Sequence, residues 1–425
     1  MSCKVQQSVC SDCVTYAKSR IKFNILNTFN NVMRQVIRNN IVQANNIDTS
    51  EKVYHLLVDG NSVLKSSLVN KDAVNSKGEE YGAILLFLRR IGQLLMKRDF
   101  NHCAVCWDGF NSGALRWKLY ADYKANRDKN YEAASAISDP KSDYDAYIAS
   151  YCRKVMEYHQ KNKIGVRRGE TDDENFQRQR AILQEILDEL FVRQYMYENV
   201  EGDDLIAYYC KHKQKNDYIV IVSEDRDISQ LIQDDICLYI PSKKVFVSPK
   251  NDVEVLGMPS YNMVLKKIIC GDASDNIKGI KGMGETTLEK YYPQIKTEKA
   301  TLDGFLSTCR QLLEERKADK KKPLKCLENA INSVTDGCQG ERVYDVNRQI
   351  IDLSEPLLTD EAIEELKNIY AAPIDPEGRD IKNVYRIVEA NGMTEITKNI
   401  NYFGNMFGCF ESLRKKEIEF FEKSK

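Results

Sequence analysis

The 425-residue sequence has no run of about 18 apolar residues, which is the length that a transmembrane helix requires. Its first residues, MSCKVQQSVCSDCVTY, also lack the basic start and the apolar core of a signal peptide. An excess of one charge is absent too, because 62 Lys and Arg face 63 Asp and Glu. This balance gives no overall sign of a nucleic-acid partner, although the local distribution of charge matters more than the sum. We therefore expect an intracellular protein without a membrane span.

The composition is that of a soluble globular chain, with 42% hydrophobic and 29% charged residues and no internal repeats. Its length predicts about two to three domains. The pattern divides into an N-terminal helical extension over 1–50, an α/β core over 51–255, a helical region over 256–330 and a C-terminal helical extension over 331–425. No role is assigned to the last of these segments.

Short apolar runs in the core predict buried strands. They cover residues 54–58, 102–107, 218–222 and 236–240. Stretches of helical periodicity, at 80–97 and 181–197, lie between them. Strands that alternate with helices predict an α/β fold with a mostly parallel central sheet flanked by helices.

Acidic residues follow three of these four strands. Asp59, Asp108 and the pair Asp225 and Asp227 lie at or just after the strand ends. Ligand sites of open parallel sheets lie outside the carboxyl ends of the strands. A single Asp-Gly after a strand is more often a turn, but the recurrence at three strands favours a shared cleft.

Two further acidic groups lie at expected helix ends. Glu201, Asp203 and Asp204 open one helix, and a last helical turn would place Asp272 and Asp275 on one side of another. Either group alone could be a helix cap or a turn. Together with the strand ends they make nine carboxylates, which repel one another unless cations neutralise them. Oxygen ligands without His or Cys favour hard ions, so we expect two Mg²⁺ or Mn²⁺ ions, the arrangement used for phosphodiester hydrolysis.

Basic and aromatic side chains alternate over residues 116–131, in a wider segment, 113–198, that is rich in Tyr, Lys, Arg and Asp. Arg116, Lys124 and Arg127 are interleaved with Trp117 and Tyr123. Cations beside aromatic faces are typical of a channel for single-stranded nucleic acid, and a solvated basic face is the alternative. The glycine-rich turn over 279–284 has two readings as well: backbone N–H groups that approach a phosphate, or a tight turn between helices.

Six motifs occur in an order that resembles the 5′-nuclease family, the flap endonucleases and 5′→3′ exonucleases. They are LLVDGNS (56–62), CWDG (106–109), YKANRD (123–128), VEGDD (200–204), SEDRD (223–227) and CGDASDNIKGIKGMGETT (270–287). The family includes standalone phage enzymes and the nuclease domain of bacterial DNA polymerase I. The resemblance implies a PIN-like core, a helical arch over about 113–198 and a helix-3-turn-helix DNA-binding region over 256–330.

The resemblance also implies roles for the acids. The first metal site would be formed by Asp59, Asp108, Glu201 and Asp203. The second would be formed by Asp225, Asp227 and Asp272, with Asp204 and Asp275 completing the acidic shell. Departures from the family pattern are Gly202 and Glu224, and Glu224 adds an acid beside the second site.

DNA contacts follow from the same resemblance. Tyr123 would stack on a base, and Lys124 and Arg127 would reach the scissile phosphate and take part in catalysis with Asp59, Asp203 and Asp225. The turn would grip the duplex backbone, with a bound K⁺, through Gly279, Lys281, Gly282, Gly284 and Thr286.

The implied activity is a metal-dependent, structure-specific 5′ nuclease that cuts 5′ flaps and removes nucleotides or RNA primers in DNA replication or repair. Its partners would be DNA with a flap, a nick or an RNA primer, and a single-strand binding protein, sliding clamp or polymerase. We expect a monomer, encoded by a bacteriophage and acting in the cytoplasm of its bacterial host. A PIN-like ribonuclease and a non-catalytic protein that binds DNA structures are the alternatives.

Overall fold

The computed structural model describes residues 52–124, 172–332, 343–369, 372–397 and 399–425. The chain divides into two compact units, residues 1–51 and residues 52–425, and every described residue belongs to the second. The N-terminal helical extension and most of the arch segment therefore lie outside the described residues. Within the described ranges, no helix is both long and apolar enough to cross a membrane.

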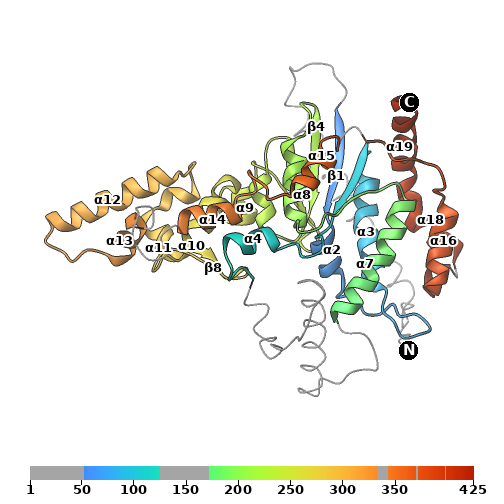
Figure 1. Cartoon of the computed structure of the whole chain (residues 1–425), viewed down its shortest axis with the longest axis horizontal. Helices are drawn as coiled ribbons and strands as arrows, with labels where there is room; N and C mark the ends of the chain where they lie inside the picture. Colours follow the sequence, from blue (N-terminus) through green and yellow to red (C-terminus); the bar gives the residue numbers. More distant parts are fainter. Residues whose placement is uncertain (1–51, 125–171, 333–342, 370–371, 398) are drawn as a thin grey trace, which may run out of the picture. The chain divides into compact units, whose positions relative to one another are not determined.

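A six-stranded sheet forms the centre of this unit (Figure 1), with the strand order β3-β2-β1-β4-β5-β6. The strands are β1 (Val53–Asp59), β2 (His102–Cys106), β3 (Arg193–Tyr195), β4 (Asp217–Val222), β5 (Ile236–Ile240) and β6 (Val245–Val247). The first five are parallel, and β6 pairs antiparallel with β5. Asp59 is in register with Cys106, and Val58 with Val222, so β1, β2 and β4 end at the same edge of the sheet.

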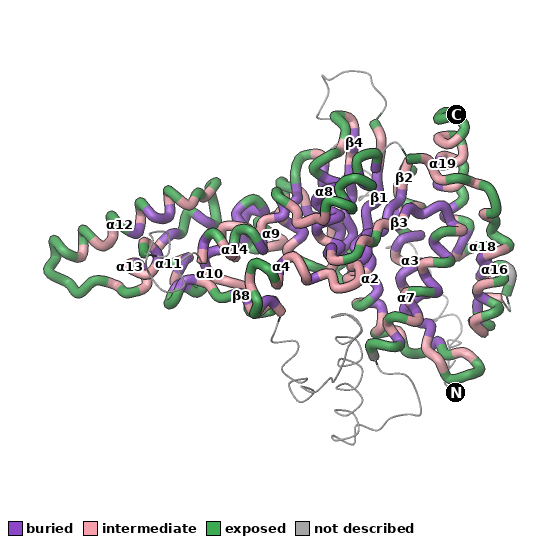
Figure 2. Tube along the Cα trace, viewed as in Figure 1, coloured by how far each residue is buried: buried purple, intermediate pink, exposed green. Residues whose placement is uncertain are grey.

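Helices cover both faces of the sheet, as alternate residues of β1 demonstrate. Leu56 and Val58 face the helices α2 (Gly60–Ser67), α3 (Gly82–Lys97) and α7 (Asp172–Glu189). Leu57 faces the opposite side, against α8 (Gly202–Lys211), η1 (Asp227–Leu231) and α15 (Asp360–Leu366). The strands are consequently buried on both faces, which explains their continuous apolar runs (Figure 2).

The C-terminal helices form a further layer over α3 and α7 (Figure 1). They are α16 (Ile381–Ala390), α17 (Thr394–Thr397), α18 (Ile400–Phe407), η4 (Gly408–Phe410) and α19 (Glu411–Ser424). Val388, Phe407 and Leu413 are buried in the same apolar cluster as the sheet, and α19 contacts β2 directly. These residues belong to the compact unit of the core rather than to a separate extension.

A third apolar cluster lies among the helices that follow the sheet. Its residues come from α4 (Ala114–Leu119), α10 (Met263–Cys270), the two-residue strand β8 (Ile277–Lys278), α11 (Glu285–Tyr291), η3 (Pro293–Lys296), α12 (Leu302–Ala318), α13 (Lys325–Asn332) and α14 (Val343–Ile351). The same part of the chain forms η2 (Ser260–Asn262), the two-residue strand β7 (Gly271–Asp272) and α9 (Asp252–Leu256), which packs on the Leu57 side of the sheet. Phe305, Leu327 and Met283 are among its buried residues, so the glycine-rich turn and the α12–α13 hairpin share one core.

The predicted α/β fold with a mostly parallel sheet is confirmed, as are the four predicted strands and the helix over 80–97. The helix expected over 181–197 is wrong in its second half. Helix α7 ends at Glu189, and Phe191 has a positive φ of 60°, which redirects the chain into β3. Two short edge strands, β3 and β6, escaped prediction because three residues are too few to establish an alternating pattern.

Candidate active site

Asp59 and Asp108 end two adjacent strands and are fixed by hydrogen bonds to neighbouring elements. Asp59 Oδ1 accepts from the backbone N–H of Ser62 at 2.9 Å and caps α2, and its Oδ2 accepts from Ser223 Oγ at 2.6 Å. Asp108 accepts from Asn61 Nδ2 at 2.6 Å and from the N–H of Gly202 at 2.8 Å. These bonds join the ends of β1, β2 and β4 to the start of α8.

Asp203 lies in the first turn of α8, close enough to these acids to interact with them electrostatically. Burial raises the pKa of Asp203 well above its usual value, and the charges of Asp59, Asp225 and Asp108 add to that shift. Burial also raises the pKa of Asp59 to about 7, against the hydrogen bond from Ser223. A cluster of carboxylates that resist ionisation together is the electrostatic property expected of a cation site.

Glu201, at the N-cap of α8, is surrounded by cations. Lys124 Nζ donates to Glu201 Oε1 at 2.7 Å, Arg116 Nη1 lies 3.2 Å from Oε2, and the Tyr123 hydroxyl donates to both oxygens. Burial by itself would raise the pKa of Glu201, but the charges of Arg116 and Lys124 outweigh it and lower that pKa. Glu201 is therefore held as a carboxylate.

Asp204 has a different environment from the other acids. Arg116 binds it with two N–H groups, at 2.5 and 3.1 Å, and both side chains are buried. The N–H of Leu357 donates to the same carboxylate at 2.9 Å. Both oxygens of Asp204 thus serve a buried ion pair that joins α8, α4 and the segment before α15. This geometry gives Asp204 a positioning role within the acidic shell.

Lys267, on α10, joins two acids that are distant in sequence. Its ammonium contacts Asp227 Oδ1 and lies 2.6 Å from Asp272 Oδ2. Burial and the charge of Asp225 raise the pKa of Asp227 to about 6, against the opposing charge of Lys267. Burial would also raise the pKa of Asp272, but hydrogen bonds from Lys267 and Ser274 lower it. Sequence reasoning missed Lys267, although its place one turn before the acids on an expected helix was a signal.

The acidic pair after α10 lies on a hairpin, not on a helical turn as expected. Helix α10 ends at Cys270, and Gly271 has a φ of +78° that an L side chain would rarely adopt. Asp272 lies in β7, and Asp275 in the turn before β8. The structure still brings this pair to the site, because one small cavity is lined by acids from three segments: Glu201, Asp203, Asp227, Asp272 and Asp275.

The donor set of this cluster is oxygen only, which suits Mg²⁺ or Mn²⁺. Lys124, Lys267 and Arg116 neutralise part of its charge directly. Across the described residues, no three His, Cys, Asp or Glu side chains converge closely enough to hold one ion between them. The assignment of individual acids to two metal sites therefore stays a prediction.

The segment expected to begin the arch lies against the acids. Tyr123 is buried at 3% exposure, and its ring packs in the third apolar cluster, so the structure leaves it no free face for a base. Arg116, expected among the cations of a nucleic-acid channel, is buried against Asp204. Lys124 keeps 24% of its side chain exposed beside Glu201. Arg127 lies outside the described residues.

The glycine-rich turn has an open outer surface. Lys281, Gly282, Gly284 and Thr286 are exposed, while Met283 between them is buried. Gly282 has a φ of +83°, so the turn requires glycine there. Gly279 is required for another reason, because a Cβ would lie 2.1 Å from the backbone of Cys270. The turn is thus rigid and accessible, as a backbone contact with a phosphate requires.

Glu224, expected as an extra acid beside the second metal site, is used elsewhere. Its carboxylate accepts hydrogen bonds from the backbone N–H and the hydroxyl of Ser242, in the turn between β5 and β6. The side chain therefore fixes that turn.

Residues 54–257 match the family model described as "5′-3′ exonuclease, N-terminal resolvase-like domain". The match starts within β1 and ends after α9, so it spans the sheet and seven of the nine predicted acids. Over these residues, the chain is similar to the 5′-nuclease family.

The curated relatives that the chain resembles are much longer proteins, and the similarity covers only part of each. Over 175 residues the chain is 31% identical to the thermostable DNA polymerase I of Thermus aquaticus. This match covers 41% of this chain and 21% of the polymerase. Over 273 residues it is 28% identical to the DNA polymerase I of Bacillus subtilis. That match covers 63% of this chain and 26% of the polymerase. The chain therefore spans about a quarter of the length of these relatives.

A solved structure similar to this chain is that of the bacteriophage T5 D15 flap endonuclease, in a complex with DNA and metal ions. The two chains are 17% identical, and the match covers 81% of this chain and 100% of that one with a TM-score of 0.48.

Proposed function

We propose that this protein is a structure-specific 5′ nuclease that hydrolyses DNA phosphodiesters with the help of two divalent ions. The observation that carries the proposal is the carboxylate cluster at one edge of the sheet. Asp59, Asp108 and Asp225 follow three adjacent strands, and the negative charges of all three raise the pKa of Asp203 on α8. Such a group is unstable without a counter-charge, and a phosphodiester substrate cannot supply one because it is itself an anion.

Two Mg²⁺ or Mn²⁺ ions would neutralise this cluster, with Asp59, Asp108, Glu201 and Asp203 at one and Asp225, Asp227 and Asp272 at the other. The chemistry that such ions supply is activation of a water and stabilisation of the leaving oxygen. The protein's own part is orientation. Ser62 and Ser223 fix the Asp59 carboxylate, and Asn61 fixes that of Asp108. The Arg116–Asp204 pair fixes the first turn of α8 in the same way.

Substrate binding is supported by positive charge and open backbone beside the acids. The Lys124 ammonium lies at the edge of the cluster, where it can pair with a phosphate that approaches Glu201. The exposed turn over 279–284 offers a second contact, which reads no base sequence. We extend the proposal to cutting of 5′ flaps, 5′→3′ removal of nucleotides and removal of RNA primers in DNA replication or repair. A K⁺ at the turn, the implied protein partners and a bacteriophage source also stay predictions.

The test is cleavage of a 5′-labelled flap DNA with Mg²⁺. We expect short 5′ products from the native protein, and at least about a 1,000-fold slower reaction from Asp225→Asn/Asp227→Asn, because a two-ion site loses its second ion. The matched control is Asp234→Asn, which changes an exposed Asp between η1 and β5. Absence of cleavage by the native protein, or full cleavage by the double variant, would refute the proposal.

The same assay separates the alternatives. Faster turnover of single-stranded RNA than of flap DNA would favour the ribonuclease. Tight flap binding without metal-dependent cleavage would favour the non-catalytic DNA-binding protein. We expect neither, since the acids that catalysis requires are all present in the sequence.

A further inference from the structure

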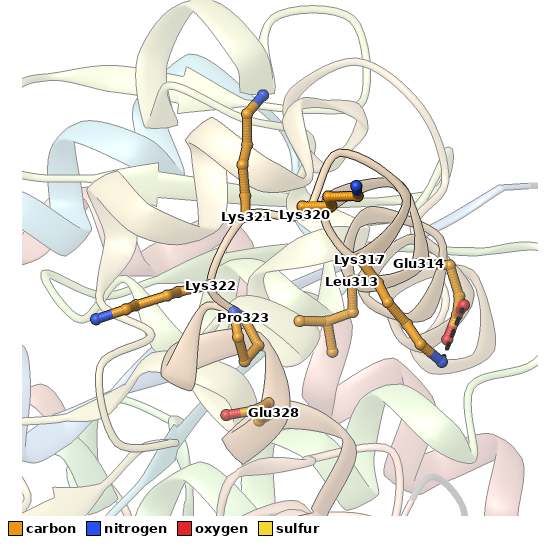
Figure 3. Close-up of a pocket in the computed structure, with 8 residues that line it drawn as sticks. All are labelled: Leu313, Glu314, Lys317, Lys320, Lys321, Lys322, Pro323 and Glu328. Atoms are coloured by element: carbon orange, nitrogen blue, oxygen red, sulfur yellow. Dashed lines mark ion pairs between the residues drawn. The ribbon is translucent and has the colours of Figure 1, made fainter.

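The turn that joins α12 to α13 carries a dense group of basic side chains, which we call the basic tip (residues 316–325). It contains six Lys or Arg and one acid, Asp319. The basic residues are Arg316, Lys317, Lys320, Lys321, Lys322 and Lys325. The five lysines are all exposed, and Lys320, Lys321 and Lys322 project in different directions around a surface hollow that Leu313 and Pro323 also line (Figure 3).

The backbone of the basic tip is held by its own hydrogen bonds. Lys320, two residues after the end of α12, has a φ of 54°, and the N–H of Lys321 donates to the carbonyl of Arg316 at 2.8 Å. Arg316 Nε in turn donates to the carbonyl of Lys322 at 2.9 Å. Arg316 is therefore used to shape the turn, while the lysines beyond it are presented to solvent.

Acidic neighbours neutralise few of these lysines. Lys321 lies 2.8 Å from Asp319, and Lys317 lies 4.0 Å from Glu314, but these exposed pairs are weak. Within the part of the chain that the structure describes, Lys320 and Lys322 make no ion pair with a carboxylate. A concentrated positive charge with so little internal compensation attracts a polyanion.

The basic tip is tied to the glycine-rich turn. Asn329, on α13, donates to the carbonyl of Lys281 at 2.9 Å, and a Cβ on Gly282 would lie 3.3 Å from that of Cys326. Leu327 is fully buried in the apolar cluster that also contains the turn. The two surfaces are thus parts of one packed body.

The separation between the two surfaces follows from chain geometry. Four helical steps and three extended residues separate Asn329 from Lys322, which corresponds to at most about 17 Å. Along one strand of duplex DNA, about 17 Å corresponds to about five base pairs.

We infer that the basic tip is a second contact for the phosphate backbone of the duplex arm, at most about five base pairs beyond the contact made by the glycine-rich turn. The inference rests on the proposed function, because it takes the turn as a duplex contact. Lysines that reach phosphates add affinity and salt dependence without base specificity. An acidic protein surface would fit the same charge, but it would not explain the rigid link to the turn.

The test compares Lys320→Gln/Lys321→Gln/Lys322→Gln with a matched control, Lys415→Gln/Lys423→Gln/Lys425→Gln. In the control, Lys415 and Lys423 lie on α19 and Lys425 follows it. Fluorescence anisotropy in EDTA measures binding of flap DNAs whose duplex arms are shortened one base pair at a time. On long arms the tip variant should bind about tenfold more weakly, and its log–log salt slope should fall by about 2 to 3. On arms that reach the glycine-rich turn but end before the tip, its affinity should equal that of the native protein, and the difference should appear within about five further base pairs.

Three outcomes overturn the inference: equal affinity and salt slope on long arms, an equal loss of affinity on all arms, or the same loss in the control. Cleavage with Mg²⁺ at saturating DNA is measured in parallel, and the tip variant should keep the native rate. A native protein that fails to cut contradicts the proposed function, whereas the dependence on arm length judges the basic tip by itself.

Discussion

Glu417 on α19 offers the sharpest test of how the C-terminal helices stabilise the core. Its side chain is fully buried, and its Oε1 lies 2.8 Å from Nδ1 of His102 on β2. Arg193 on β3 donates to Oε1 at 3.1 Å and to Oε2 at 2.6 Å. Glu417→Gln keeps the shape of the side chain but removes the charge that compensates the buried guanidinium of Arg193.

The expected cost is that of breaking a buried ion pair by neutralising one partner, about 3–5 kcal/mol of unfolding free energy. The compact unit has about 370 residues, so its unfolding entropy is about 0.8 kcal/mol/K. The melting temperature of Glu417→Gln should therefore fall by about 4–6 °C near neutral pH.

This loss should depend on pH with a defined sign. Burial would raise the pKa of Glu417, but the hydrogen bonds from His102 and Arg193 outweigh it and lower that pKa below its usual value. A carboxyl with a depressed folded pKa contributes stability above its unfolded pKa, about 4.5, and loses that contribution as the pH falls through the folded pKa. The difference between native and variant protein should therefore shrink below about pH 4.5.

Differential scanning calorimetry of native protein and Glu417→Gln, at pH 7 and at pH 4, measures both effects. Glu419→Gln, an exposed site two residues along the same helix, is the matched control and should melt like the native protein. A melting temperature of Glu417→Gln within about 1 °C of native at pH 7 would refute the reasoning, as would a difference that grows between pH 7 and pH 4.

Three further changes test the site and the turn. Asp204→Asn should lower the unfolding free energy by about 3 kcal/mol, because it removes the carboxylate that binds Arg116 with both oxygens and leaves this buried guanidinium only its contact with Glu201. Urea unfolding would measure this loss, and an unchanged midpoint contradicts the buried pair. Asp203→Asn should melt higher than native in EDTA, because it removes one of several mutually repelling acids. Mg²⁺ at 100 times its dissociation constant should raise the unfolding free energy of the native protein by about 2.7 kcal/mol, and this variant should lack that increase. Equal increases of the two proteins in calorimetry would exclude Asp203 as a ligand. Gly282→Ala should lower the unfolding free energy by about 1 kcal/mol, because Gly282 has a positive φ and an added Cβ would approach Cys326. The exposed Gly404→Ala should not destabilise the protein, and thermal melting measures both variants.

The sheet could be predicted from sequence because its signal is local. Strands β1, β2, β4 and β5 are buried on both faces, so each is a short continuous apolar run. The acids after β1, β2 and β4 then converge because parallel strands end at a shared edge. The register, which places Asp59 opposite Cys106 rather than Asp108, was not part of the prediction.

The partners of these acids could not be predicted, because they come from distant segments. Lys267 bridges to Asp227 across 40 residues, and Arg116 reaches Asp204 across 88. Nothing local in the sequence distinguishes an arginine that faces DNA from one that is buried against an acid. Tyr123 illustrates the same limit, since its burial depends on the packing of α10 and α14 rather than on its neighbours in sequence.

The Arg193–Glu417 pair also sets a time scale for biosynthesis. The two residues are 224 positions apart, so at about 5–20 residues per second β3 is made roughly 10–45 s before its acidic partner. During that interval the Arg193 guanidinium, at the edge of the sheet, cannot be buried as an ion pair because Glu417 has not yet been made. The strands that carry the acids can pair early, but the β3 edge must wait for the last helix. Ribosome-bound chains will therefore expose this edge to chaperones and proteases long after the strands that carry the acids have been translated.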